Sequence, residues 1–341
     1  MPVIFARSIS NLMLRGILSR YPTSSQFFFF IGIFWLSGFF FQRIGLFLSF
    51  PILGTNDMEA VLEVLTNPSE QDIADAGARF AMKLVNIMYA IGMLLGGLLF
   101  VYLTSGAKIA DLGKNRPAVL PVLLITVSLF ALEPIVVLMA EWNAAMIPAG
   151  EAKDAMLEFS DQYSRLTRAM LVQGSLTDNL TTLLMLAVLA PIWEELIYRG
   201  LMQRLLHAMS GNIHIAIWTA AILFSVFHLD FMNLLPRMLL GAFFGYLYYW
   251  SRNIWVPILG HMINNATFVI LSWSTGVDPT ESAVPMDPVL AAAIGAGILA
   301  ISLVVFRRYA SAPELEPPPR TLITLKDPGS PEDQDDRGEN R

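Results

Sequence analysis

Cysteine is absent from this 341-residue chain, and charged residues are scarce, at 15% of the total. Without cysteine the chain can form no disulfide, no thiolate metal site and no cysteine nucleophile. An ordinary soluble domain carries about 25% charged residues, so this composition excludes that class. Histidine is also rare. The four histidines are His207, His214, His228 and His261.

Hydrophobic sequence takes the place of charge, with 55% hydrophobic residues and a mean hydropathy of +0.56. A helix needs about 20 apolar residues to cross a bilayer, and several stretches reach or approach that length. We therefore predict an all-α fold, a polytopic membrane helix bundle of about eight transmembrane helices, with the lipid bilayer as its environment. The expected spans are 27–51, 82–104, 118–140, 175–200, 213–229, 235–251, 254–273 and 288–307.

The basic residues predict how these spans are oriented. With the N-terminus inside, the inner stretches hold Arg7, Arg15, Arg20, Lys108, Lys114, Arg116, Arg204, Arg252, Arg307 and Arg308. The outer stretches hold only Arg79, Lys83, Lys153, Arg165 and Arg168. This asymmetry predicts that both termini are cytoplasmic, in agreement with an even number of crossings. The net charge of -6 reflects acidic loops and an acidic tail and gives no reason to expect a nucleic-acid partner.

Composition divides the chain into five segments. An amphipathic start and a tail rich in proline and acidic residues flank the apolar part, and such a tail cannot bury enough apolar surface to fold. The predicted segments are a cytoplasmic amphipathic segment (1–25), three N-terminal transmembrane helices with extracytoplasmic loops (26–174), a core of four transmembrane helices (175–275), a last transmembrane helix (276–309) and a disordered acidic tail (310–341).

Glu194 and Glu195 are adjacent carboxylates, and Arg199 follows them. Of all the features of this apolar chain, these charges cost the most free energy to place within a membrane span. Charged residues within membrane spans usually face an interior and have a function there. On a helix, Glu195 and Arg199 lie four residues apart on one face, whereas Glu194 points about 100° away. We interpret Glu195 as the partner that Arg199 holds in place. Glu194 is then free to act as a general base.

Two further pairs follow on later spans, Phe224 with His228 and His261 with Asn265, and the members of each pair are four residues apart. Glu194 and His228 are each 17 residues from Gly211, where the chain is expected to turn. In an antiparallel hairpin both would lie roughly 25 Å from that turn. We expect Glu194, His228, His261 and Asn265 to converge at one level, nearer the cytoplasmic face.

The three motifs are Glu-Glu-x-x-x-Arg, Phe-x-x-x-His and His-x-x-x-Asn, and they occur in this order within residues 175–275. This pattern resembles the CPBP family (CAAX protease and bacteriocin-processing, also called Abi), which includes type II CAAX prenyl endopeptidases. The resemblance implies an intramembrane endopeptidase that uses a glutamate-activated water. Its substrate would be a membrane-associated polypeptide, of CAAX type or otherwise lipid-modified, and its location a bacterial cytoplasmic (inner) membrane.

The resemblance also implies roles for single residues. Glu194 corresponds to the water-activating base, with Glu195 as its neighbour and Arg199 as the motif arginine. His228 would assist Glu194, while His261 and Asn265 would stabilise the oxyanion of the tetrahedral intermediate. A competing version has Glu194, His228 and His261 binding a divalent metal such as zinc, which would activate the water. The sequence leaves the metal and metal-free versions open.

Other interpretations explain the same residues without proteolysis. Glu195 with Arg199 can be a purely structural ion pair, and His261 with Asn265 can simply bond neighbouring helices. A non-proteolytic scaffold, a bacteriocin-immunity-like protein and a proton- or ion-coupled transporter are therefore alternative functions. The lack of an evident inverted repeat disfavours the transporter. The chain also lacks the His-Glu-x-x-His pattern of common zinc proteases. The sequence does not define an oligomeric state.

Overall fold

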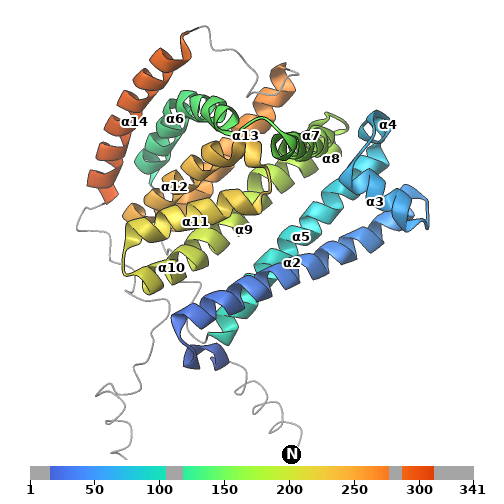
Figure 1. Cartoon of the computed structure of the whole chain (residues 1–341), viewed down its shortest axis with the longest axis horizontal. Helices are drawn as coiled ribbons and strands as arrows, with labels where there is room; N and C mark the ends of the chain where they lie inside the picture. The colour runs from blue at the N-terminus through green and yellow to red at the C-terminus, as the bar shows by residue number, and fades with distance from the viewer. Residues whose placement is uncertain (1–15, 105–117, 276–285, 311–341) are drawn as a thin grey trace, which may run out of the picture.

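The structure, a computed structural model, describes residues 16–104, 118–275 and 286–310. Residues 1–15 of the predicted amphipathic segment and residues 311–341 of the predicted tail lie outside the described part. Every regular element within the described ranges is a helix, which confirms the all-α class (Figure 1). In chain order the elements are η1 (Ile17–Arg20), α2 (Thr23–Leu53), α3 (Met58–Thr66), α4 (Glu70–Ala74), α5 (Ala76–Leu103), α6 (Val119–Met146), α7 (Glu151–Leu171), α8 (Leu176–Thr182), η3 (Leu183–Leu189), α9 (Ala190–Ile197), η4 (Tyr198–Met202), α10 (Gln203–Ser210), α11 (Ile213–Phe227), η5 (Phe231–Asn233), α12 (Leu234–Ser251), α13 (Trp255–Thr275) and α14 (Pro288–Ala310).

Within the described ranges, five helices are long and apolar enough to cross a membrane, which makes the chain an integral membrane protein. They are α2, α5, α6, the continuous helix Leu176–Ser210 that runs from α8 to α10, and α14.

The other three predicted spans are helices that do not meet the same criteria of length and hydropathy. With 15 residues, α11 extends only about 22 Å, short of the roughly 30 Å hydrocarbon core. Polar residues such as Arg237 in α12 and His261 in α13 interrupt the other two. Helix α12 packs against α6, α11, α13 and α14. Helices enclosed by other helices can carry polar groups because these groups face the bundle interior.

Helices α2 and α5 form a close pair whose approach depends on small residues. Ser37 Oγ in α2 donates a hydrogen bond to the Gly92 carbonyl in α5 at 2.7 Å. A Cβ atom on Gly92 would lie 2.6 Å from the Ser37 carbonyl oxygen and 2.7 Å from Phe41 Cβ. Only glycine fits this contact, as in other membrane helix pairs with small residues at the interface.

We expect Gly92→Ala to destabilise the protein by about 1–3 kcal/mol, because the added methyl group forces two backbones apart. Thermal unfolding of the purified protein in detergent micelles measures this change. The matched control is Gly32→Ala on α2, where an added Cβ meets nothing within 4 Å. Equal effects of the two substitutions would contradict the close packing at Gly92.

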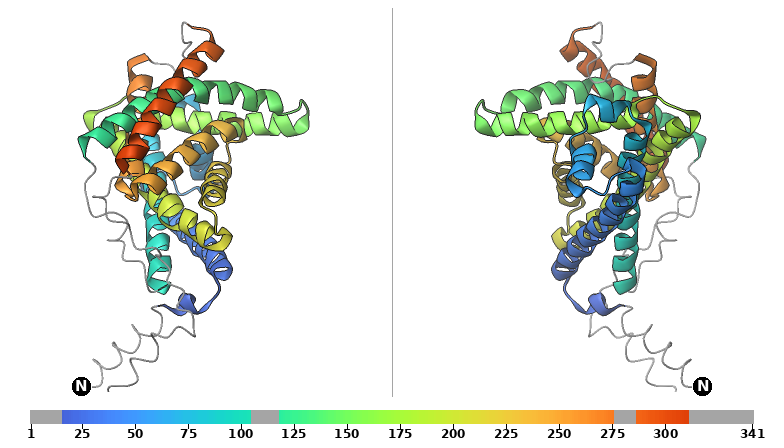
Figure 2. Two further views of the ribbon diagram at one scale, coloured as in Figure 1. Left: turned by 90° about the vertical axis from the view of Figure 1, so that its left-hand side faces the viewer. Right: turned by 90° about the vertical axis from the view of Figure 1, so that its right-hand side faces the viewer.

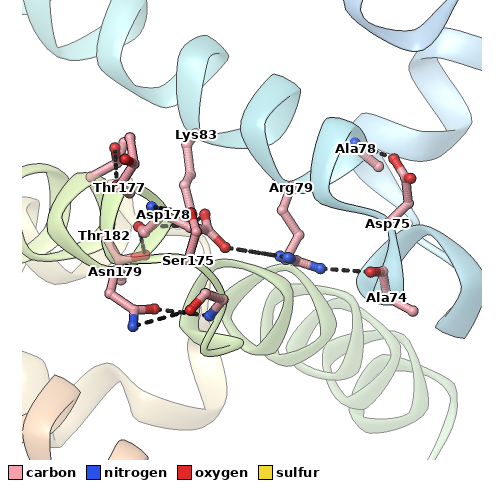
Figure 3. Close-up of polar contacts among 12 residues, drawn as sticks. Ala74, Asp75, Ala78, Arg79, Lys83, Ser175, Thr177, Asp178, Asn179 and Thr182 are labelled. Atoms are coloured by element: carbon pink, nitrogen blue, oxygen red, sulfur yellow. Dashed lines mark hydrogen bonds and ion pairs between the residues drawn. The ribbon is translucent and has the colours of Figure 1, made fainter.

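An ionic cluster joins the N-terminal pair to the start of the long helix (Figure 3). The Nε and Nη2 atoms of Arg79 lie 3.3 Å from Asp178 Oδ2, and Lys83 Nζ pairs with Asp178 Oδ1. Arg79 is 6% exposed and Lys83 is fully buried. Asp178 is thus the shared counterion of two buried cations, and it fixes α8 against α5.

Helix α7 crosses the end of the bundle at which α11 ends and α12 begins. It contacts α3, α4 and α5 on one side and α13 and η5 on the other. In the side views it runs across the direction of α5 (Figure 2). Its sequence is polar on one face, with acidic and basic residues throughout, as expected of a helix that lies along a surface. It therefore covers this end of the bundle, which we call the α7 end.

Candidate functional site

Glu194 and Glu195 lie on α9, in the middle of the long helix and between two π-helical segments, η3 and η4. Neighbouring faces of α9 pack into different apolar clusters: Trp193 joins the cluster with α2 and α5, and Ile192 joins the cluster with α13. π-helical turns inside α-helices are rare and occur often at functional sites. The two carboxylates are therefore held between the N-terminal helices and the later helices.

Glu195 is fully buried and bonded to two partners. Its Oε1 atom accepts a hydrogen bond from Arg199 Nη1 at 2.8 Å and lies 2.8 Å from His261 Nδ1. The pair with Arg199 was predicted from the spacing, whereas the contact with His261 was not. Glu195 Oε2 is buried and has no hydrogen-bond partner among the described residues.

Arg199 is fixed by aromatic rings and by a backbone carbonyl. Its Nη2 atom donates to the Gly241 carbonyl at 2.9 Å, and its guanidinium lies over the rings of Phe224 (5.0 Å) and Phe244 (5.7 Å). One helical turn later, Gln203 Nε2 donates to the Gly245 carbonyl at 3.3 Å. Cation–π contacts are strongest where the cation is desolvated, and Arg199 is 2% exposed. The arginine thus connects α9, α11 and α12.

The His261 ring stacks on Phe244, with 5.0 Å between the ring centroids. Because Nδ1 faces Glu195, the other nitrogen faces Glu194, and His261 Nε2 lies 3.7 Å from Glu194 Oε2. That separation is too long for a direct hydrogen bond but suits a bridging water. A water molecule beside this gap can lie within hydrogen-bond distance of both the Glu194 carboxylate and the His261 imidazole.

His228 lies one aromatic ring away from this gap. Its Nδ1 atom is 2.7 Å from the Phe224 carbonyl oxygen, and its ring contacts the Phe224 ring with 4.7 Å between centroids. The Phe224 ring also contacts His261, at 6.3 Å. Of the six predicted site residues, the structure brings Glu194, Glu195, Arg199 and His261 together directly, and it connects His228 to them through Phe224.

Asn265 is bonded to the long helix rather than to the glutamates. Its Nδ2 atom donates to the Leu186 carbonyl in η3 at 2.9 Å, and its Oδ1 atom accepts from Asn264 Nδ2 at 3.2 Å. Leu186 lies within the π-helical segment, where backbone hydrogen bonding departs from the α pattern. Asn265 therefore ties α13 to η3, one turn from His261.

The predicted metal ligands Glu194, His228 and His261 do not form a zinc site as arranged. No group of three or more His, Asp or Glu side chains in the described ranges is placed to hold a metal ion. Zinc accepts histidine and glutamate as ligands, but it requires their ligand atoms about 2.0–2.2 Å from the ion, and these three side chains are not gathered around one such position. The donors suit zinc, but their arrangement does not.

Sequence reasoning missed one charged residue near the site, Arg237 in the first turns of α12. Its guanidinium binds Asp230, with Nη2 at 3.1 Å from Oδ2. The signal was present, because an arginine inside the predicted span 235–251 is as costly as a glutamate inside the span 175–200.

One segment of the chain matches a known protein family. Residues 176–267 match the model of a family described as type II CAAX prenyl endopeptidase Rce1-like, and all six predicted residues lie within them. This match confirms the resemblance predicted from the three motifs. No solved structure matches the chain significantly.

Three curated relatives are similar over about the same length of chain. YdiL of Bacillus subtilis (strain 168), a proposed membrane peptidase, is 33% identical over 85 residues, which cover 25% of this chain and 34% of the relative. The uncharacterized protein YpbD of the same organism is 31% identical over 90 residues (25% and 43%). The membrane-embedded CAAX protease MroQ of Staphylococcus aureus (strain USA300) is 29% identical over 89 residues (25% and 36%). The chain thus spans less than half the length of each of these relatives.

Proposed function

We propose that this protein is an intramembrane endopeptidase that hydrolyses a peptide bond with a water activated by Glu194. The observation that carries the proposal is the 3.7 Å gap between Glu194 Oε2 and His261 Nε2. Behind this gap, Glu195 and Arg199 form a buried pair with 0% and 2% of their side-chain surfaces exposed. A base and an imidazole held on either side of one water position are the components that amide hydrolysis needs.

In the proposed reaction, Glu194 takes a proton from the water as the water oxygen attacks the scissile carbonyl carbon. His261 donates from Nε2–H to the oxyanion that forms. Glu194 then gives its proton to the leaving nitrogen as the C–N bond breaks. His261 can donate from Nε2 while Nδ1 donates to Glu195 only when the imidazole is protonated, and the Glu195 carboxylate compensates that charge.

The remaining predicted residues have supporting roles in the proposal. Arg199 donates hydrogen bonds to Glu195 and to the Gly241 carbonyl, and it thereby holds the carboxylate in position. One Nδ2–H of Asn265 donates a hydrogen bond to the Leu186 carbonyl. We propose that the second Nδ2–H donates to the oxyanion. The Nδ1 atom of His228 contacts the Phe224 carbonyl oxygen, so we propose that its Nε2 atom assists Glu194.

The proposed substrate is a membrane-associated polypeptide of CAAX type or with another lipid modification. It is supported by the description of the matching family and by the name of the MroQ protease. We further propose a bacterial inner membrane with both termini cytoplasmic. The test is a proteomic comparison of membranes from cells that produce wild-type protein or Glu194→Gln. We expect one uncleaved precursor to accumulate in the variant, and identical membrane proteomes would contradict proteolysis.

We also expect peptide cleavage to persist, within about twofold, after the purified protein is dialysed against EDTA. The physical reason is that Glu194, His228 and His261 do not surround one metal position, so we propose that Glu194 activates the water without a metal. The measurement is the rate of cleavage of a farnesylated fluorogenic peptide before and after dialysis. Loss of cleavage that added Zn²⁺ restores would contradict the metal-free proposal.

A further inference from the structure

Arg237 lies on the face of α12 that forms one wall of the site. Arg237, Gly241 and Phe244 are spaced i, i+4 and i+7, so they share one face of the helix. The Gly241 carbonyl binds Arg199, and the Phe244 ring stacks on His261. Arg237 therefore continues the site wall toward the α7 end, about 10 Å along the helix axis from Phe244.

Two groups hold the Arg237 guanidinium in place from outside α12. Asp230, which is 3% exposed, contacts Arg237 Nη2 through Oδ2 at 3.1 Å and Nη1 through its carbonyl oxygen at 3.4 Å. The Tyr163 ring of α7 lies 5.9 Å from the guanidinium carbon. Asn233 Nδ2 also donates to Asp230 Oδ2 at 2.9 Å, so the carboxylate that orients the arginine is itself oriented.

The other N–H donors of Arg237 remain available. A guanidinium has five N–H donors in a planar fork, and among the described residues two of them have an acceptor. The side chain keeps 16% of its surface exposed, so the remaining donors can be reached.

We propose that Arg237 binds a carboxylate of the polypeptide substrate and thereby sets which peptide bond reaches Glu194. Guanidinium is the side chain best suited to a carboxylate, because two parallel N–H groups can bind its two oxygens. The ligand group is the free C-terminal carboxylate of the substrate or an acidic side chain near its scissile bond. This inference rests on the proposed endopeptidase function and adds a specificity-determining residue to it.

The experiment compares one farnesylated fluorogenic peptide as its C-terminal acid and as its C-terminal amide. For each peptide, binding to the purified full-length protein is measured by fluorescence anisotropy, and cleavage is measured as kcat/KM. We expect wild-type protein to prefer the acid by about ten- to a hundredfold in both readouts, as for other hydrogen bonds to charged groups. Arg237→Gln removes this preference and leaves the amide peptide unaffected. Arg237→Lys, which keeps the charge and loses the fork, has an intermediate preference.

Two further variants separate binding from folding. Arg252→Gln at the other end of α12 is the matched control and keeps the preference for the acid. Asp230→Asn combined with Arg237→Gln removes both charges, so no buried carboxylate is left unpaired, and it also lacks the preference. The inference is overturned if neither a C-terminal carboxylate nor an acidic side chain beside the scissile bond strengthens binding to wild-type protein. Equal losses for both peptides in Arg237→Gln also overturn it. If wild-type protein binds the acid selectively and cleaves neither peptide, the endopeptidase proposal fails and the role of Arg237 stands.

Discussion

Replacing Glu194 by glutamine is expected to lower kcat for peptide cleavage by about 10²–10⁴-fold, the range of general acid–base catalysis. Glutamine has nearly the size and shape of glutamate but cannot take a proton from water. Glu194 makes no hydrogen bond to another described residue and faces His261 across 3.7 Å, so its replacement leaves the packing intact. Cleavage of a farnesylated peptide by purified protein, followed by mass spectrometry, measures the loss, and thermal unfolding measures the fold.

Two other glutamates serve as comparisons for Glu194→Gln. Glu141, at the exposed end of α6, is the matched control, and Glu141→Gln should keep wild-type activity. Glu195→Gln should lower both activity and stability, because Arg199 and His261 share its Oε1 atom. Full activity in Glu194→Gln would exclude this glutamate as the base, whatever the effect at Glu195.

Replacing Asp178 by alanine is expected to destabilise the protein by about 3–5 kcal/mol, the cost of leaving buried charges uncompensated. Asp178 is the carboxylate that pairs with both Arg79 and Lys83. Without it, two nearly buried cations face each other at the junction of α5 and α8. Unfolding in detergent micelles, by heat or by denaturant, measures the change.

The charge balance of this cluster gives a sharper comparison. Lys83→Met removes one of two cations and leaves Arg79 paired with Asp178, so we expect it to cost much less than Asp178→Ala. Asp161→Ala on an exposed face of α7 is the matched control and should change stability by less than about 0.5 kcal/mol. Equal losses for Lys83→Met and Asp178→Ala would mean that packing, rather than charge, holds the junction.

The sequence predicted contacts within a helix better than contacts between helices. The spacing of Glu195 and Arg199 was sufficient for their pairing, because residues four apart are neighbours on any α-helix. The partner of Asn265 was not predictable, because Leu186 becomes available only through the π-helical segment η3. The bond between His261 and Glu195 likewise depends on how α13 lies against α9.

Hydropathy predicted a helix in each apolar stretch but was a poorer guide to which helices face lipid. It measures the composition of a stretch, whereas enclosure depends on the neighbours that a helix acquires in the fold. Helix α12 carries Arg237 and is surrounded by four helices, so its polar residue is tolerated inside the bundle. A single arginine in a predicted span, like a pair of glutamates, indicates a polar interior, so Arg237 could have been recognised as a site residue from the sequence.

The bonds from Arg199 to the Gly241 carbonyl and from Gln203 to the Gly245 carbonyl repeat one contact at an interval of one turn. Both acceptors are main-chain atoms that glycine leaves uncovered, and a Cβ at position 245 would lie 3.0 Å from Gln203 Oε1. The alignment of the two helices therefore depends on the spacing of two glycines on α12 that matches the spacing of the two donors, Arg199 and Gln203. Mutational libraries of α12 should accordingly accept many substitutions at the exposed position Tyr249, and very few at Gly241 and Gly245.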